Sequence, residues 1–191
     1  TRAPAVDYKD LDPDHHMFER MISYWNLNPA EHRAKTACWM SHYNILKKIS
    51  EQRLMRCIVV EDDAQQMSEL PDPHELGNEF LYLAGYFSNL KLTKGHLKDK
   101  VLSKRGLNQL NRETHRMLMF VSYYIPHYQI ATQIINYLDS LPRIRAIDCM
   151  AHTFPIPMNY YYPALFVEAP GPSTIRKKKT KHCNTDYMLA S

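Results

Sequence analysis

Three consecutive acids follow a short apolar run about one third of the way along the chain. The run is Cys57-Ile58-Val59-Val60, and the acids are Glu61, Asp62 and Asp63. Carboxylates this close repel one another unless a cation neutralises them, and their oxygens suit Mg²⁺ or Mn²⁺, ions that can bridge a substrate diphosphate. The pattern predicts a divalent metal site, and its alternative interpretation is a solvated acidic turn after a strand.

A second candidate group contains Cys38, Ser41 and His42, whose spacing of three and four residues places them on one helix face. A nucleophile–base pair is one interpretation. However, helical side chains at this spacing lie side by side, and no oxyanion hole is recognisable in the sequence. We therefore predict that His42 is a buried, hydrogen-bonded residue beneath the acidic run.

Asp148 is a third candidate, with His152 four positions further on. A carboxylate after Ala146-Ile147 can act as a general base or hold a substrate hydroxyl. A helix-capping aspartate would have the same spacing, so both roles stay open.

A basic run near the C-terminus, Arg176-Lys177-Lys178-Lys179 with Lys181, is large enough to supply the whole net charge of +4. It is either a solvated tail or a phosphate-binding segment. Basic residues elsewhere alternate with acids, so we expect no general nucleic-acid surface.

These residues depend on the elements that position them. Asn28 and Pro29 predict a helix start, and the helix should end near residues 51–53. Its predicted buried face is Ala34, Cys38, Ser41, Ile45 and Ile49. Strands are predicted at 57–60, 80–83, 117–125, 146–148 and 164–167, and a helix that starts at Pro126 should bury Ile130, Ile134, Ile135 and Leu138.

Strands that alternate with helices indicate an α/β fold with a mostly parallel central sheet and flanking helices. We expect a single domain over residues 1–191. Ligands of open α/β sheets bind beyond the carboxyl ends of the strands, which is where the pattern places the acidic run.

Composition and glycine spacing exclude several classes of protein. None of the five glycines precedes a lysine, so a P-loop is excluded, and a GxGxxG motif is also absent. No apolar run approaches the roughly 20 residues of a membrane span, and no signal peptide is visible. The four cysteines form no CxxC pair, so we expect reduced thiols in the cytoplasm. A metal-dependent nuclease or phosphodiesterase, a nucleotide-sugar transferase and an inactive basic binding module remain.

Two segments resemble glycosyltransferase family 25, which includes lipopolysaccharide glycosyltransferases and collagen galactosyltransferases. The segment from Ala34 to His42, ACWMSH at its end, is similar to the family's G-E-[IV]-[GA]-C-x-x-S-H, with Lys35 in place of the glutamate. The second is the strand that ends in Glu61-Asp62-Asp63. Weaker matches follow in the family's order: Leu81-Tyr82-Leu83-Ala84-Gly85, Ser122-Tyr123-Tyr124-Ile125 with Ala131, Ala146-Ile147-Asp148 and Ser173-Thr174-Ile175.

The resemblance implies a GT-A type fold, a UDP-sugar donor, and a glycan or glycoprotein acceptor. It also implies bound Mn²⁺ or Mg²⁺. Asp63 would contact the metal directly, and Glu61 would be a metal or donor ligand. With Asp62, Glu61 would hold metal-bound water, ribose or donor sugar. Asp148 would be the catalytic base if the reaction inverts.

Basic side chains would complete the implied site. His152 and His182 are alternative metal ligands, and Arg176 and Lys177 would bind the donor. The family's opening nucleotide-binding strand is expected before residue 1. The compact form and unusual loops suggest an origin in a large virus, such as a chlorella virus, and hence the host cytoplasm.

Overall fold

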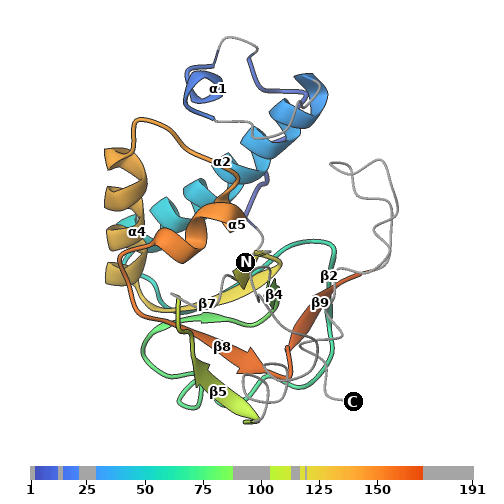
Figure 1. Cartoon of the computed structure of the whole chain (residues 1–191), viewed down its shortest axis with the longest axis vertical. Helices are drawn as coiled ribbons and strands as arrows, with labels where there is room; N and C mark the ends of the chain where they lie inside the picture. The colour runs from blue at the N-terminus through green and yellow to red at the C-terminus, as the bar shows by residue number, and fades with distance from the viewer. Residues whose placement is uncertain are drawn as a thin grey trace.

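Helices packed against a mixed sheet make up the fold (Figure 1). The computed structural model describes residues 3–12, 15–21, 29–87, 104–112, 117–118 and 120–169. Its helices are α1 (Met17–Arg20), α2 (Pro29–Glu51), α4 (Tyr128–Ser140), α5 (Ile147–Met150) and the 3₁₀ helix η1 (Ala151–Thr153). Its strands are β1 (Met55–Val60), β2 (Ala64–Gln66), β3 (Phe80–Tyr82), β4 (Tyr86–Phe87), β5 (Gly106–Gln109), β6 (Met117–Leu118), β7 (Ser122–His127), β8 (Met158–Tyr162) and β9 (Phe166–Glu168).

The central sheet has five strands in the order β1-β7-β3-β8-β5. Only β3 and β8 pair in parallel, while the three other pairs are antiparallel. The α/β class is therefore confirmed, but the expected mostly parallel sheet is wrong. Alternating strands and helices predict parallel pairing only when successive strands are neighbours, and here β7 inserts between β1 and β3. Two small sheets, β2-β9 and β4-β6, complete the strands.

One face of the sheet carries the main hydrophobic core. Helices α2, α4 and α5 lie over this face (Figure 1), and Trp39, Leu46 and Ile134 pack there against Phe80 and Tyr123. The next residues along the same strands face the other way, as the two-residue period of a strand requires. On that opposite face Leu81 and Tyr124 pack with Leu76, Leu165 and Phe166. The sheet is thus covered on both faces.

Helix α2 begins at Pro29 and ends at Glu51, as predicted. Its buried face differs from the predicted one, because Cys38, Ser41 and Ile45 are only half-buried. The buried residues are Ala34, Thr36, Ala37, Trp39, His42, Leu46 and Ile49. This broad stripe arises because α2 packs against α1, α4 and α5 and also contacts the sheet, where His42 meets Tyr123 of β7.

Three other expectations are corrected by the fold. Pro126 lies inside β7, and α4 begins at Tyr128. Strand β3 pairs only with Tyr123 and Tyr124, so Pro126 stands outside that ladder, where a missing N–H is tolerated. Residues 146–148 form no strand, because Asp148 lies in α5. The predicted strand at 117–125 divides into β6 and β7.

Strand β1 was expected to be buried, but it lies at an edge of the sheet and only Val59 is buried. Arg53 lies in the turn between α2 and β1 and has a φ of 52°. This turn returns the chain to the sheet beside α2. None of the described helices combines the length and apolar character that crossing a membrane requires.

Candidate functional site

The acidic run lies directly after β1 and is anchored on both sides. The backbone N–H of Glu61 donates to the carbonyl of Val121 at 2.9 Å, and the hydroxyl of Ser122 donates to the carbonyl of Val59 at 3.0 Å. On the other side, the N–H of Ala169 donates to the carbonyl of Asp63 at 2.7 Å. The backbone of the run is therefore held between the central sheet and the β2-β9 pair.

The carboxyl ends of β1, β3 and β8 all lie at the same end of the sheet, where these strands stop. This follows from the pairing, because β7 is antiparallel to both β1 and β3, and β3 is parallel to β8. At this end the N–H groups of Leu83 and Ala84 donate to the carbonyl of Ser122, at 3.1 and 3.2 Å. The acidic run thus lies beyond the carboxyl ends of the strands, where ligands of α/β sheets bind, although this sheet is mixed.

Asp63 stands in a strongly negative environment. Partial burial is the largest cause that raises the pKa of its carboxyl, to about 6, and the charges of Glu61, Glu168 and Asp62 raise it further. Glu168 reaches this position because Ala64 pairs with it across β2 and β9. A cation placed here would relieve the repulsion among these carboxylates.

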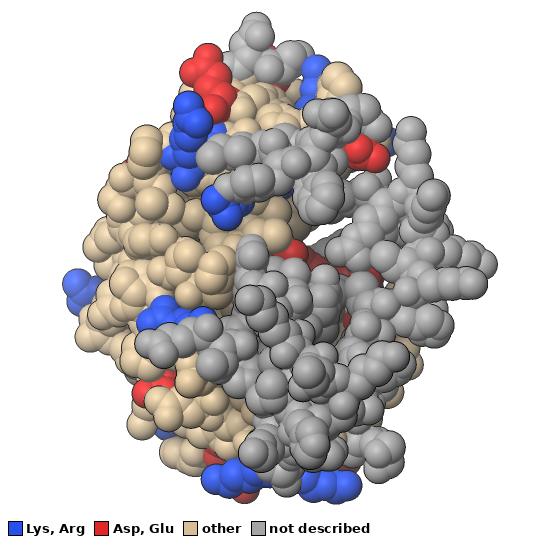
Figure 2. Space-filling model, viewed as in Figure 1, with Lys and Arg blue, Asp and Glu red and all other residues tan. Residues whose placement is uncertain are grey.

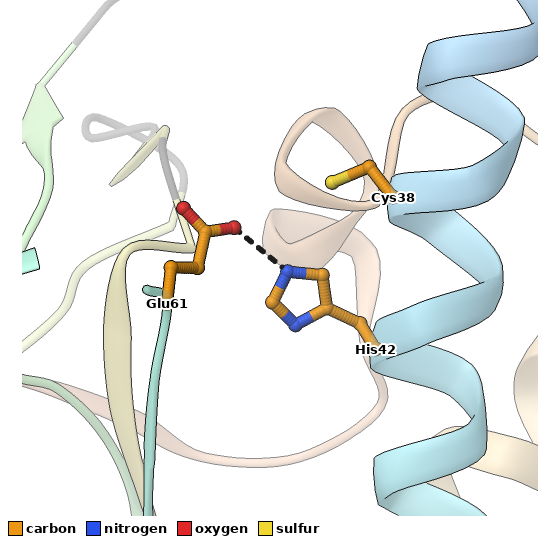
Figure 3. A group of neighbouring side chains, drawn as sticks. All are labelled: Cys38, His42 and Glu61. Carbon is orange, nitrogen blue, oxygen red and sulfur yellow. Dashed lines mark hydrogen bonds and ion pairs between the residues drawn. The ribbon is translucent and has the colours of Figure 1, made fainter. Parts of the chain in front are cut away.

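His42 connects the acidic run to helix α2 (Figure 3). Its imidazole is buried, with 4% of its surface exposed. Its Nε2 lies 2.9 Å from Oε1 of Glu61, and its Nδ1 lies 3.1 Å from the hydroxyl of Tyr123. Because an ionised carboxylate only accepts, Nε2 carries the proton, and in the neutral ring Nδ1 accepts from Tyr123. The prediction of a buried, hydrogen-bonded His42 is confirmed, and its partner is an acid of the run itself.

Cys38 lies on the same helix, one turn before His42, and its side chain faces the same space (Figure 3). Burial raises the pKa of its thiol to about 12, and the charges of Glu61, Asp148 and Asp63 also raise it. The thiol is therefore protonated near neutral pH and is a poor nucleophile. This agrees with the sequence argument against a Cys38–His42 nucleophile–base pair.

Asp148 also acts on this region of the molecule, from helix α5. It is the second residue of α5, and its Oδ1 accepts from the N–H of Cys149 at 2.7 Å. Its charge raises the pKa of the Cys38 thiol and of the Tyr82 hydroxyl, for both of which burial is the larger cause. Asp148 thus acts electrostatically on Cys38 from helix α5 and not from the predicted strand end.

The described residues contain one group of three metal-ligating side chains: Cys38, His42 and Glu61. Neither Asp63 nor His152 belongs to it. His152 lies in η1, directly after α5. Three predicted site residues, Arg176, Lys177 and His182, lie outside the described residues, as does the segment 173–175.

Charged side chains are unevenly placed over the described part of the face in Figure 2. Acidic side chains are visible near its centre and also near its outline, and Lys and Arg are scattered over the rest of the described surface. Around Asp63 itself, the charges of Glu61, Glu168 and Asp62 favour a cation over a bare anion as the ligand.

The sequence did not point to Tyr123 or Glu168 as parts of this site. Tyr123 lies in an aromatic strand, and its contact with His42 joins residues 81 positions apart. Glu168 meets Asp63 only through the β2-β9 pairing. Both contacts join residues that are far apart in the sequence, so no local spacing of residues predicts them.

The model of glycosyltransferase family 25 (LPS biosynthesis protein) matches residues 3–151. The matched segment contains Cys38, His42, the acidic run and Asp148, and it ends just before His152. No curated protein matches the chain significantly.

Proposed function

Since the chain belongs to glycosyltransferase family 25, we propose that it transfers a sugar from a UDP-sugar donor to a glycan or glycoprotein acceptor, with Mn²⁺ or Mg²⁺ held at Glu61-Asp62-Asp63. Family membership carries the general activity, that of a glycosyltransferase. It also favours a transferase over the metal-dependent nuclease that the residues alone left open. The donor, the metal and the roles of individual side chains are our proposal.

The observation that carries the metal proposal is the environment of Asp63. Asp63 is exposed at the surface, yet partial desolvation of its carboxyl and the charges of three acidic neighbours together raise its pKa to about 6. Folding has thus placed this carboxylate where its charge is unfavourable. Such an arrangement is typical of sites at which a ligand supplies the missing countercharge. Oxygen ligands of this kind suit Mg²⁺ and Mn²⁺.

In this proposal the bound metal would stabilise the charge of the leaving diphosphate. Asp63 would contact the metal directly. Glu61, with one oxygen held by His42 at 2.9 Å, would present the rest of its carboxylate to metal, metal-bound water or ribose. The exposed Asp62 would contact ribose or donor sugar.

Asp148 is the proposed acceptor-side residue. Its electrostatic effect on Cys38 supports a position near the acidic run, and its place on α5 keeps it separate from the backbone that holds the metal ligands. From there it would accept the proton of the attacking hydroxyl if the reaction inverts.

Further parts of the proposal rest on the sequence alone. They are a metal-ligand role for His152 or His182, donor binding by Arg176 and Lys177, a GT-A type fold, a cytoplasmic location and a viral origin.

The test is calorimetric titration of the chain with a panel of nucleotide sugars, with Mn²⁺ present and after its removal by EDTA. We expect UDP-sugars to bind, and their affinity to fall at least about tenfold without metal. Equal affinity in both conditions would refute the metal role. Absence of binding by any nucleotide sugar would instead favour the inactive basic module.

Two variants test the metal role of Asp63 in the same titration. Asp63→Asn should lose most of the metal-dependent affinity, because a neutral amide attracts the cation less strongly. Glu69→Gln removes one negative charge from an exposed position beyond β2 and serves as the control. It should bind donor as the parent chain does.

A further inference from the structure

A thiol, an imidazole and a carboxylate converge between α2 and the end of β1 (Figure 3). The sulfur of Cys38, a ring nitrogen of His42 and a carboxylate oxygen of Glu61 lie within 4.8 Å of one another. Cys38 and His42 are four residues apart on one helix, so successive turns present sulfur and nitrogen side by side. Glu61 approaches from the strand. The cluster therefore joins helix α2 to the end of strand β1.

The donor atoms of this cluster differ in kind from those of the acidic run. Mn²⁺ and Mg²⁺ prefer oxygen ligands, whereas a thiolate with an imidazole favours Zn²⁺. A tetrahedral zinc ion binds at about 2.0–2.3 Å and so holds its ligand atoms about 3.3–3.8 Å apart. Atoms within 4.8 Å of one another need move only about 1 Å to reach that geometry.

We propose that Cys38, His42 and Glu61 form a binding site for Zn²⁺ that ties helix α2 to the end of strand β1. Three protein ligands leave a fourth position for water, as in zinc sites that remain open. The proposal goes beyond the transferase activity, and it concerns an ion of a different class from the donor's metal.

The hydrogen bonding of His42 suits this role. When Nε2 binds the ion, Nδ1 carries the proton and donates to the hydroxyl of Tyr123, which lies 3.1 Å away. Zinc-bound histidines commonly donate their second N–H to such a partner, which fixes the orientation of the ring. The ring of His42 therefore needs no rotation, and only its tautomer changes.

The charges around the cluster also suit a cation. Glu61, Asp148 and Asp63 all act electrostatically on Cys38, so the cluster stands in a negative field. Binding would replace the thiol proton of Cys38 by the ion, and that proton would leave to solvent. Because Glu61 belongs to both sites, zinc bound here would compete with the donor's metal for this carboxylate.

Cobalt is a suitable probe, since Co²⁺ occupies zinc sites and reports its ligands in the absorption spectrum. Co²⁺ is added to the full chain after a chelator has removed all metals. We expect a thiolate-to-cobalt charge-transfer band in the near ultraviolet and intense visible bands typical of four-coordinate cobalt. Zn²⁺ should abolish both sets of bands as it displaces the cobalt.

The cysteine variants assign the sulfur. Cys38→Ser should lose the charge-transfer band, and its Zn²⁺ affinity, measured by competition with a chromogenic chelator, should fall at least about tenfold. Cys57→Ser is the matched control, because Cys57 is a half-buried cysteine of β1 outside the cluster. It should keep both the band and the affinity.

The result can overturn the proposal without reference to sugar transfer. A parent chain that binds no Co²⁺, or whose cobalt spectrum lacks the thiolate band, refutes the site even if Cys38→Ser fails to fold. An equal band in folded Cys38→Ser refutes it as well. Asp63→Asn should keep the cobalt spectrum while it loses metal-dependent donor binding, so this variant separates a failure of the zinc site from a failure of the donor site although both use Glu61.

Discussion

The imidazole of His42 and the carboxylate of Glu61 lie 2.9 Å apart, Nε2 to Oε1, across the boundary between α2 and the sheet. His42 is buried, while the side chain of Glu61 keeps 29% of its surface exposed. The buried ring thus holds a carboxylate that still reaches solvent. In this way the histidine of the helix motif orients the first acid of the strand motif.

Loss of the imidazole should destabilise the fold. His42→Ala removes the partner of the buried Tyr123 hydroxyl and the edge-to-face contact with Phe120. We expect the free energy of unfolding to fall by about 2–3 kcal/mol, the scale of a buried polar group left unsatisfied. Urea denaturation measures it, with the exposed His74→Ala as the control. Native stability combined with lost transfer would place His42 in the reaction instead.

The pKa of Asp63 predicts how stability depends on pH when metal is absent. Its folded-state pKa of about 6 lies above the ordinary value of 3.8, so the folded state binds this proton more tightly than the unfolded state does. The contribution of Asp63 therefore favours folding below about pH 4 and is lost as the pH rises towards 6. Above pH 6 the charged carboxylate leaves a constant penalty.

Asp63→Asn isolates that contribution. In EDTA, the melting temperature of the variant relative to the parent should rise between about pH 4 and pH 6 and then level off. Thermal denaturation at a series of pH values measures the difference. A difference that stays constant over this range would show that Asp63 titrates normally.

Asp148 separates acceptor chemistry from donor binding. Asp148→Asn should keep the parent's UDP-sugar affinity, because the proposed metal ligands are untouched, while turnover falls by about 10²-fold or more, as for a lost general base. Asp63→Asn should lose affinity and turnover together. Calorimetry and transfer rates on one acceptor distinguish the two. Near-parental turnover in Asp148→Asn would remove it from the catalytic residues.

Arg20 should stabilise the helical layer without a role in catalysis. Its Nη2 donates to the carbonyls of Leu138 and Leu141, at 3.1 and 2.8 Å, at the C-terminal end of α4. There a cation satisfies unpaired carbonyls and the helix dipole. Arg20→Ala should lower the free energy of unfolding by about 1–2 kcal/mol. Arg143→Ala, in the exposed turn after α4, should change it far less.

Local features of the sequence were enough to predict several elements and part of the site. Pro29 and the apolar spacing after it located α2, because capping and helical periodicity act within a few residues. The β-branched run before Glu61 located β1 for the same kind of reason. The resemblance of ACWMSH and of Glu61-Asp62-Asp63 to family motifs identified the family, which the match over residues 3–151 shows.

Only the tertiary structure decided which elements meet. Strand periodicity records which face is buried but not which strand is the neighbour, so the antiparallel position of β7 beside β1 had no local signal. The same limit applies to side chains. Asp148 reaches the centre from α5, and His42 lies between Glu61 and Tyr123 because long-range packing brings α2, β1 and β7 together. The sequence identifies the chemical groups that each residue offers, but only the fold determines which residue becomes its partner.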